Sequence, residues 1–146
     1  MTRRVPPVAV AAIAAAAQVA VSPGKRPTRF SVAAAGVIAV PALYLLVGSV
    51  VRFRKHRTTV DPRAAAEATS LVTGGPNAWS RNPMYAGMLG LLVAHSVARR
   101  SAVAALPAAG FAVWIDRAQI PPEEQHLEAR FGARYVAYTR RVRRWI

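Results

Sequence analysis

The stretch LVTGGPNAWSRNPMYAG, from Leu71 to Gly87, decides how the rest of the chain is arranged. Its quartet Gly74 to Asn77 is typical of a turn, because glycine tolerates positive φ and proline holds φ near −65°. Asn82 and Pro83 then predict a helix start, since asparagine is a favoured N-cap and proline suits the first helical position. We expect this helix to continue through the apolar residues to Val97.

Two residues at the mouth of this helix indicate more than a structural cap. Arg81 and Tyr85 place a cation and an amphipathic ring beside helical N–H groups, which attract anions. The same residues also fit a well-capped, buried helix that binds nothing. The stretch therefore leaves a ligand site and a structural cap as alternatives.

The composition indicates a membrane protein. The chain has 146 residues, a net charge of +14, 53% apolar residues and 18% charged residues, which is too apolar for an ordinary soluble domain. Nucleic-acid binding is not expected, because the basic residues lie between apolar blocks and form no known binding motif. The absence of cysteine excludes disulfides and thiolate chemistry, and the three histidines lie far apart, so we expect no metal site.

The first two apolar segments predict membrane helices. Val8 to Val21 could be the apolar region of a signal peptide, but Ser22 to Pro27 offers no convincing cleavage pattern, and we interpret it as a first membrane helix. Phe30 to Val51 contains no charged residue and exceeds the roughly 20 residues that cross a bilayer. Pro41 within it is expected to kink the helix.

Two shorter apolar segments, Met84 to Val97 and Ala102 to Ile115, predict a tight helical hairpin packed on the longer helices. Ala64 to Ala68 predicts a short helix before them. The hairpin carries small residues that let membrane helices approach closely. They are Gly87, Gly90, Ala94, Ala104, Ala108 and Ala109. Together the segments predict an all-α, polytopic membrane bundle of about four transmembrane helices in a single domain, residues 1–146.

The distribution of basic residues predicts the orientation of this bundle. With four spans, 15 of the 20 Lys and Arg fall on the side that holds both termini and the loop from Arg52 to Arg81. Because cytoplasmic loops carry an excess of basic residues, we expect both termini and this loop in the cytoplasm.

The chain after the last predicted span forms a second motif. Pro121 and Pro122 before Glu123 and Glu124 predict a new helix start, because acidic residues in a first turn complement the helix dipole. The aromatic and basic residues that follow predict an interfacial amphipathic helix on anionic lipid. They are Phe131, Tyr135, Tyr138 and Trp145, with Arg130, Arg134, Arg140, Arg141, Arg143 and Arg144.

LVTGGPNAWSRNPMYAG, the apolar hairpin and EEQHLEARFGARYVAYTRRVRRW occur in an order that resembles the isoprenylcysteine carboxyl methyltransferase and phospholipid methyltransferase family of integral membrane enzymes. The resemblance runs from about Thr58 to Trp145. It implies methyl transfer from S-adenosylmethionine to a lipophilic small-molecule or lipid acceptor that enters from the bilayer. It also divides the chain into N-terminal helices, residues 1–57, and a cofactor-binding half, residues 58–146.

The resemblance also implies the residues of the site. Cofactor binding is expected of Thr69, Ser70, Leu71, Val72, Asn77, Asn82, Pro83, Met84, Tyr85 and Glu123. Glu123 can bind a cationic or hydroxyl group, the helix N-terminus a carboxylate, and Tyr85 and Trp79 can offer aromatic faces to adenine or sulfonium. Glu124 and Arg117 are the candidates for a catalytic role.

Two departures from the family pattern limit the analogy. Better-known members carry histidine where this chain has Asn82, which leaves a capping and hydrogen-bonding role there. Eukaryotic relatives place an arginine shortly before the glutamate pair, whereas Arg117 is the nearest cation here, so a carboxylate acceptor is not implied.

Sterol reductases share an Arg-x-Pro-x-Tyr stretch but have many more spans. The remaining alternative is a non-catalytic small membrane protein or assembly factor on the same fold.

Overall fold

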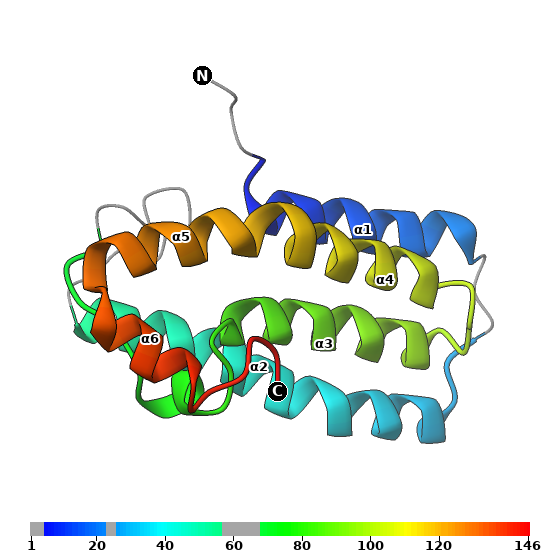
Figure 1. The fold of residues 1–146 in the computed structure, drawn as a ribbon. Helices are drawn as coiled ribbons and strands as arrows, with labels where there is room; N and C mark the ends of the chain where they lie inside the picture. The colour runs from blue at the N-terminus through cyan, green and yellow to red at the C-terminus, as the bar shows by residue number, and fades with distance from the viewer. Residues whose placement is uncertain (1–4, 23–25, 57–67) are drawn as a thin grey trace.

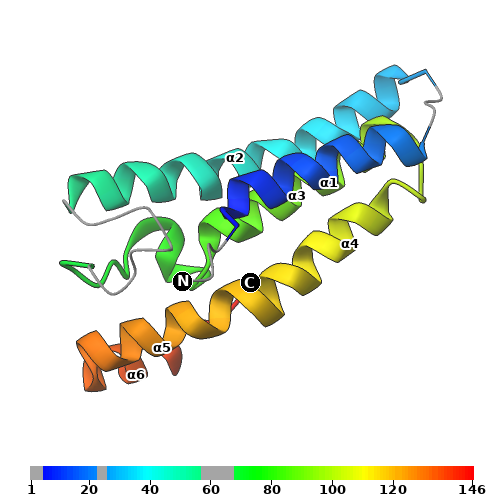
Figure 2. The same ribbon diagram turned by 90° about the horizontal axis from the view of Figure 1, so that it is seen from above.

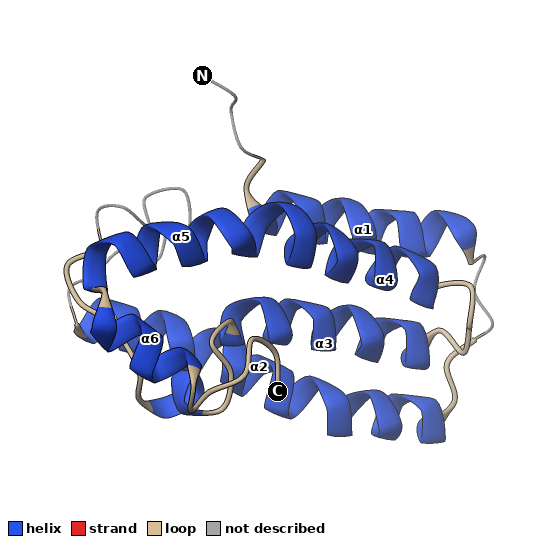
Figure 3. Cartoon of the chain, in the orientation of Figure 1, coloured by secondary structure: helices blue, strands red, loops and turns tan. Residues whose placement is uncertain are grey.

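The computed structural model describes residues 5–22, 26–56 and 68–146, and its regular elements are helices joined by loops and turns (Figure 3). The elements in chain order are α1 (Pro7–Val21), α2 (Arg29–Lys55), the 3-10 turn η2 (Gly75–Ala78), α3 (Pro83–Ala98), α4 (Ala105–Trp114), the π-helical η3 (Ile115–Gln119), α5 (Ile120–Phe131) and α6 (Ala133–Thr139). The predicted all-α class is confirmed.

The four apolar helices α1, α2, α3 and α4 run in alternating directions (Figure 1). Viewed from above, α2 and α4 lie on opposite sides of α1 and α3 (Figure 2). At one end of the bundle α2 and α5 extend beyond α1 and α3. The loop that precedes α3 lies between these extensions, and α6 lies beside α5 (Figures 1 and 2).

Two glycines of α3 let it pack closely against α2. A Cβ on Gly87 would lie 2.6 Å from the Ala42 carbonyl oxygen, and one on Gly90 would lie 2.7 Å from the Ala42 Cβ. Because no side chain fits there, glycine is what lets the two backbones approach. The predicted small residues therefore do permit close packing, and for these two the partner is α2.

The apolar core lies where α1, α3 and the α4 to α5 helix meet. Its buried members are Ala14, Tyr85, Leu92, Ala108, Phe111, Ile115 and Ile120. Tyr85 thus belongs both to the start of α3 and to the core. Substitutions at Tyr85 that remove the ring will unpack the bundle as well as alter anything bound at its hydroxyl.

The helix that begins at Ala105 does not stop before the glutamate pair. It passes from α4 through η3 into α5, where the Ile120 N–H bonds the Ile115 carbonyl in the wider π pattern. Pro121 and Pro122 carry no N–H groups to close ordinary turns at this point, and a π turn keeps the chain helical across it. The predicted helix start at Pro121 is confirmed to within one residue, since α5 begins at Ile120 with Glu123 in its first turn, but α5 continues directly from η3.

The segment after Phe131 also differs from the prediction of one interfacial helix. Gly132 has φ +51°, a conformation that side chains rarely adopt, and it breaks α5 from the short α6. Tyr135 and Tyr138 on α6 are buried, not directed to a lipid surface. The remaining residues turn back toward the start of α3, as described below.

Among the described residues, one helix, α2, is long and apolar enough to cross a membrane. It continues unbroken through Pro41 and exposes Phe30, Val37 and Val40 on its outer side. The helices α1 and α3 are apolar but shorter, so four spans remain a prediction. The predicted helix Ala64 to Ala68 lies outside the described residues, apart from Ala68 itself.

Candidate functional site

A cavity lies at the end of the bundle where the loop before α3, the start of α3, α5 and α6 meet. It encloses about 810 Å³ of space between atoms, a figure that includes the open solvent at its mouth. Nine of the ten residues predicted to bind a cofactor line it, namely Ser70, Leu71, Val72, Asn77, Asn82, Pro83, Met84, Tyr85 and Glu123. Thr69 is exposed and does not line it.

The turn before the cavity forms as its glycine and proline residues predict. Gly75 has φ +63° and is followed by the 3-10 turn η2. The Arg52 side chain at the end of α2 packs against this turn, and a Cβ on Gly75 would lie 2.7 Å from Arg52 Nε. The positive φ is what favours glycine at position 75, because the flexible Arg52 side chain could move to admit a Cβ.

Glu123 is held in the cavity wall by neighbours on two helices. The Tyr85 hydroxyl donates to its Oε1 at 2.7 Å, and the Gln119 amide, one turn earlier along the helix, donates to the same oxygen. These bonds join α3 to the η3 to α5 helix across the cavity. They orient a carboxylate whose acceptor atoms can receive a cationic or hydroxyl group of a ligand.

Glu124, although adjacent in sequence, has a different environment. Its Oε1 pairs with Arg81 at 2.7 Å and its Oε2 with Arg144 at 2.6 Å. The side chain is 19% exposed and that of Arg81 15% exposed, so the charges compensate each other away from bulk water. Glu124 therefore acts first as the bridge between two guanidinium groups.

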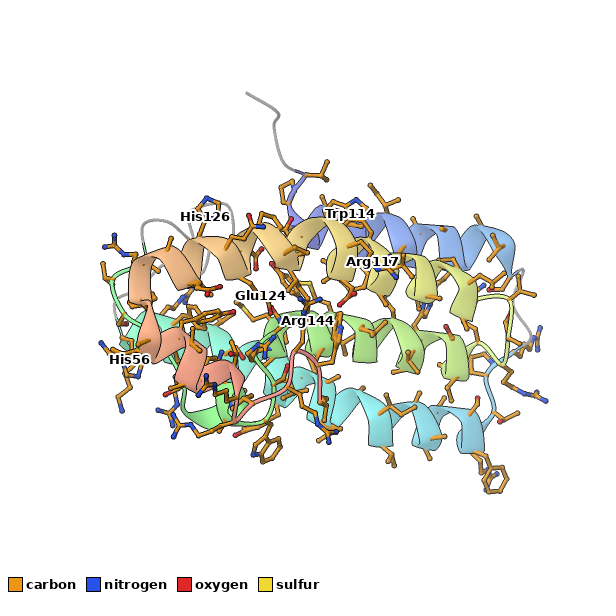
Figure 4. The ribbon with its side chains drawn as sticks, in the orientation of Figure 1. His56, Trp114, Arg117, Glu124, His126 and Arg144 are labelled. Carbon is orange, nitrogen blue, oxygen red and sulfur yellow. The ribbon has the colours of Figure 1, made fainter. Side chains whose placement is uncertain are left out.

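Arg144 extends this network to a second carboxylate. Its Nη1 lies 3.3 Å from Asp116 Oδ1, which also accepts from the Trp145 indole at 3.0 Å. The hydrogen bond from Trp145 lowers the pKa of Asp116 most, and the hydrogen bond and charge of Arg144 lower it further. Glu124 raises the pKa of Arg144 through its hydrogen bond. Glu124 and Arg144 lie between α5 and α3 (Figure 4).

Asn82 occupies the N-cap position of α3 but does not cap it. Its side chain makes no hydrogen bond to the first turn, and its Nδ2 donates to the Arg144 carbonyl at 3.1 Å. The Ser80 hydroxyl accepts the Asn82 N–H at 3.0 Å. The prediction of a helix start at Asn82 and Pro83 is confirmed, whereas the predicted side-chain cap is wrong.

The cavity also contains polar atoms without partners. In the described chain, the buried side-chain atoms that lack a hydrogen-bond partner are Asn77 Oδ1 and Arg81 Nε, and both residues line the cavity. Asn77 is only 3% exposed. The backbone carbonyl of Asn77, in contrast to its side-chain oxygen, accepts from the Tyr138 hydroxyl at 2.6 Å. Burial raises the pKa of Tyr138 to about 12. A buried acceptor left unpaired is costly unless a ligand or water completes it.

Two predicted participants lie elsewhere. The Arg117 side chain is 82% exposed, pairs weakly with Asp116 and does not line the cavity. Trp79 is 63% exposed and lies against Tyr44 of α2, with ring centroids 5.7 Å apart. Neither is placed to contact a molecule bound in the cavity.

Several cavity and network residues were missed by the sequence interpretation. Tyr135 and Tyr138 line the cavity, and Arg144 and Asp116 anchor its edge. All but Asp116 lie in or near the aromatic and basic C-terminal stretch, where a lipid-facing helix explains the same composition. No local signal separates the two interpretations, because only the break at Gly132 directs these side chains inward.

Comparisons with known proteins give one family and one relative. The family model described as phospholipid methyltransferase matches residues 30–134. An uncharacterized protein of Haemophilus influenzae is 36% identical over 63 residues, which cover 43% of this chain and 100% of that protein. No solved structure matches the chain.

Proposed function

The chain belongs to the phospholipid methyltransferase family, and from this premise we propose that it transfers a methyl group from S-adenosylmethionine to a lipophilic acceptor at a membrane. The observation that carries the proposal is the convergence of nine predicted cofactor residues on one cavity. These residues come from the loop, the start of α3 and α5, which are far apart in the sequence.

The cavity has groups that suit this cofactor. S-adenosylmethionine presents positively charged, carboxylate, hydroxyl and aromatic groups. Glu123 would hold a cationic or hydroxyl group, the α3 N-terminus the carboxylate, and Asn77 Oδ1 a hydrogen-bond donor. When bound, the cofactor supplies a methyl group on a sulfonium sulfur, so the reaction requires alignment and dryness more than a nucleophilic side chain.

The residues of the chain provide that alignment and dryness. Tyr85 and Gln119 fix the orientation of Glu123, and the buried rings of Tyr135 and Tyr138 close one wall against water. Burial raises the pKa of both tyrosines, so their hydroxyls stay protonated at neutral pH. Carboxylates, and not tyrosine phenolates, are therefore the negatively charged groups that the site offers to a cationic ligand.

Binding of the product S-adenosylhomocysteine to purified protein tests the proposal. Titration calorimetry in detergent should detect binding to the wild type. Glu123→Gln should weaken it by about 1.5–3 kcal/mol, because a charge-assisted hydrogen bond is lost. The matched control is Glu128→Gln, on the same helix but exposed and outside the cavity, which should change affinity less than twofold.

Two results would contradict the assignment. Equal affinity of wild type and Glu123→Gln would place the site elsewhere. Failure of the folded wild type to bind S-adenosylhomocysteine would favour the alternative, a non-catalytic membrane protein or assembly factor on the same fold.

We further propose a multi-pass topology with both termini and the loop before α3 in the cytoplasm, where exposed Arg140, Arg141 and Arg143 meet anionic lipid. The apolar outer side of α2 supports membrane insertion. The chain has no cysteine, so single cysteines report cleanly. A cysteine at Ser101 should be labelled from outside intact cells and one at exposed Thr73 should not. Labelling of both would overturn this topology.

A further inference from the structure

The segment formed by residues 140–146 leaves α6 and returns to the start of α3. The Arg81 N–H donates to the Arg143 carbonyl at 2.9 Å, and Arg81 Nη1 donates to the Val142 carbonyl at 3.0 Å. The Ser80 hydroxyl and Asn82 Nδ2 both donate to the Arg144 carbonyl, at 3.2 and 3.1 Å. Backbone carbonyls of this segment thus accept from three consecutive residues that precede α3.

The side chains of the same segment hold it against the opposite wall. Arg144 bridges Glu124 on α5 and Asp116 on η3, and Trp145 donates to Asp116. The segment therefore ties the start of α3 to the η3 to α5 helix. These are the two elements that carry Tyr85 and Glu123.

These contacts decide what two cavity residues present to a ligand. Asn82 is drawn to the Arg144 carbonyl and so does not cap the helix, and Glu124 has a guanidinium group on each oxygen. If the Arg144 side chain did not hold the segment, the backbone carbonyl of residue 144 could move away from Asn82. The Asn82 amide oxygen could then accept from the helix N–H groups, where it would compete with a ligand carboxylate. Glu124 would also keep only one of its two cationic partners.

We propose that residues 142–145 of this segment are part of the cofactor site, with Arg144 as the positioning residue that keeps the α3 N-terminus open and Glu124 neutralised. This inference rests on the proposed function, because the ligand it concerns is S-adenosylmethionine. Residues 140–146 do not themselves line the cavity, so they act through Asn82 and Glu124.

The first test uses the unmodified protein. Because coupling between two events is reciprocal, a segment that supports cofactor binding must itself be held more firmly by the bound ligand. Amide hydrogen exchange in residues 140–146 should slow about fivefold or more with saturating S-adenosylhomocysteine, the lower end of typical couplings. Direct shielding is not expected, since the segment lies outside the cavity wall. Residues 99–104 at the other end of the bundle provide the internal control and should not change.

The second test uses matched variants. Arg144→Gln should weaken S-adenosylhomocysteine binding about tenfold or more. Arg144→Lys keeps the positive charge but loses the planar guanidinium group that bonds two carboxylates, so its affinity should lie between those of Arg144→Gln and the wild type. Arg141→Gln, an exposed arginine of the same segment outside the network, should stay within twofold of the wild type. Affinities are to be measured well below each variant's melting temperature.

The outcomes separate this inference from the proposed function. If the wild type binds S-adenosylhomocysteine but amide hydrogen exchange in residues 140–146 is unchanged, the segment stabilises the fold without supporting the cofactor site. The inference then fails, whatever the affinities of the variants. If Arg144→Gln binds as tightly as Arg141→Gln, it also fails. If the wild type does not bind the ligand at all, the proposed function fails and takes this inference with it.

Discussion

The two ends of the bundle both bury polar side chains, but they use them differently. At the end away from the cavity, Gln18 is fully buried, and its amide donates to the Leu92 and Ala104 carbonyls and to the Ser96 hydroxyl at 2.8–2.9 Å. Its oxygen accepts from His95 Nδ1 at 2.7 Å. Gln18 thus joins α1, α3 and the start of α4.

At the cavity end, by contrast, Asn77 Oδ1 and Arg81 Nε are buried without partners. Polar groups that are all paired within the protein stabilise a fold, whereas groups left over require something else to complete them. The far end therefore stabilises the fold, and the unpaired groups of the cavity end support our proposal that a ligand binds there. Each prediction below would break or sharpen this distinction.

The largest effect is expected from Gln18→Leu, which should lower the free energy of unfolding by about 2–3 kcal/mol. The substitution removes the amide that donates to two buried carbonyls and to Ser96, and it leaves His95 Nδ1 without its acceptor. S-adenosylhomocysteine affinity should change less than twofold. Thermal unfolding in detergent and calorimetric titration measure the two quantities. Gln125→Leu, at an exposed position on α5, is the control. A loss of affinity with little loss of stability would reverse the roles that we give the two ends.

Asn82→Asp should weaken S-adenosylhomocysteine binding by about 1–3 kcal/mol, because it places a negative charge beside the Arg144 carbonyl and where the ligand carboxylate is expected. Asn82→Ser loses one neutral hydrogen bond and should cost about 1 kcal/mol or less. Calorimetric titration of both variants checks the difference. Equal affinities would mean that no anionic group binds at this helix end.

Tyr85→Phe should weaken binding by about 1 kcal/mol, because it removes the hydrogen bond that orients Glu123 while keeping the ring in the core. Tyr85→Ala should cost more in affinity and also lower the melting temperature, since it leaves a cavity among buried residues. The Phe variant therefore isolates the hydroxyl. If its affinity equals that of the wild type, the orientation of Glu123 does not depend on Tyr85.

The smallest effect concerns Asp116, whose pKa is lowered by Trp145 and Arg144. A carboxylate with a lowered folded-state pKa stabilises the protein above its ordinary pKa, and that contribution is lost as the pH falls through the folded-state value. Asp116→Asn should therefore lower the melting temperature slightly at pH 7. The difference from the wild type should shrink as the pH falls below about 4. A difference that is constant with pH would exclude a role for the carboxylate charge.

Much of the helical architecture could be predicted because its determinants are local. The bounds of α1 and the start of α2 follow from apolar composition, although α2 continues past the predicted end at Val51 to Lys55. The turn at Gly75 and the start of α3 at Pro83 follow from backbone restrictions of glycine and proline. The loop, α3 and α5 residues implied by the family resemblance also proved to share one cavity. The errors came where local rules compete with packing, as at the Asn82 cap and after Gly132.

What the sequence by itself determined is therefore the helical class, the main helix boundaries and the family, all of which depend on neighbouring residues or on ordered motifs. What only the tertiary structure decided is which partner each polar side chain of the site bonds. Glu123 and Glu124 look equivalent in sequence, yet one turns to Tyr85 and the other to two arginines. Asn82 likewise leaves its local capping role for a carbonyl 62 residues away. Such choices follow from which distant groups meet when the helices pack, because a buried polar group must pair with whatever packing brings to it.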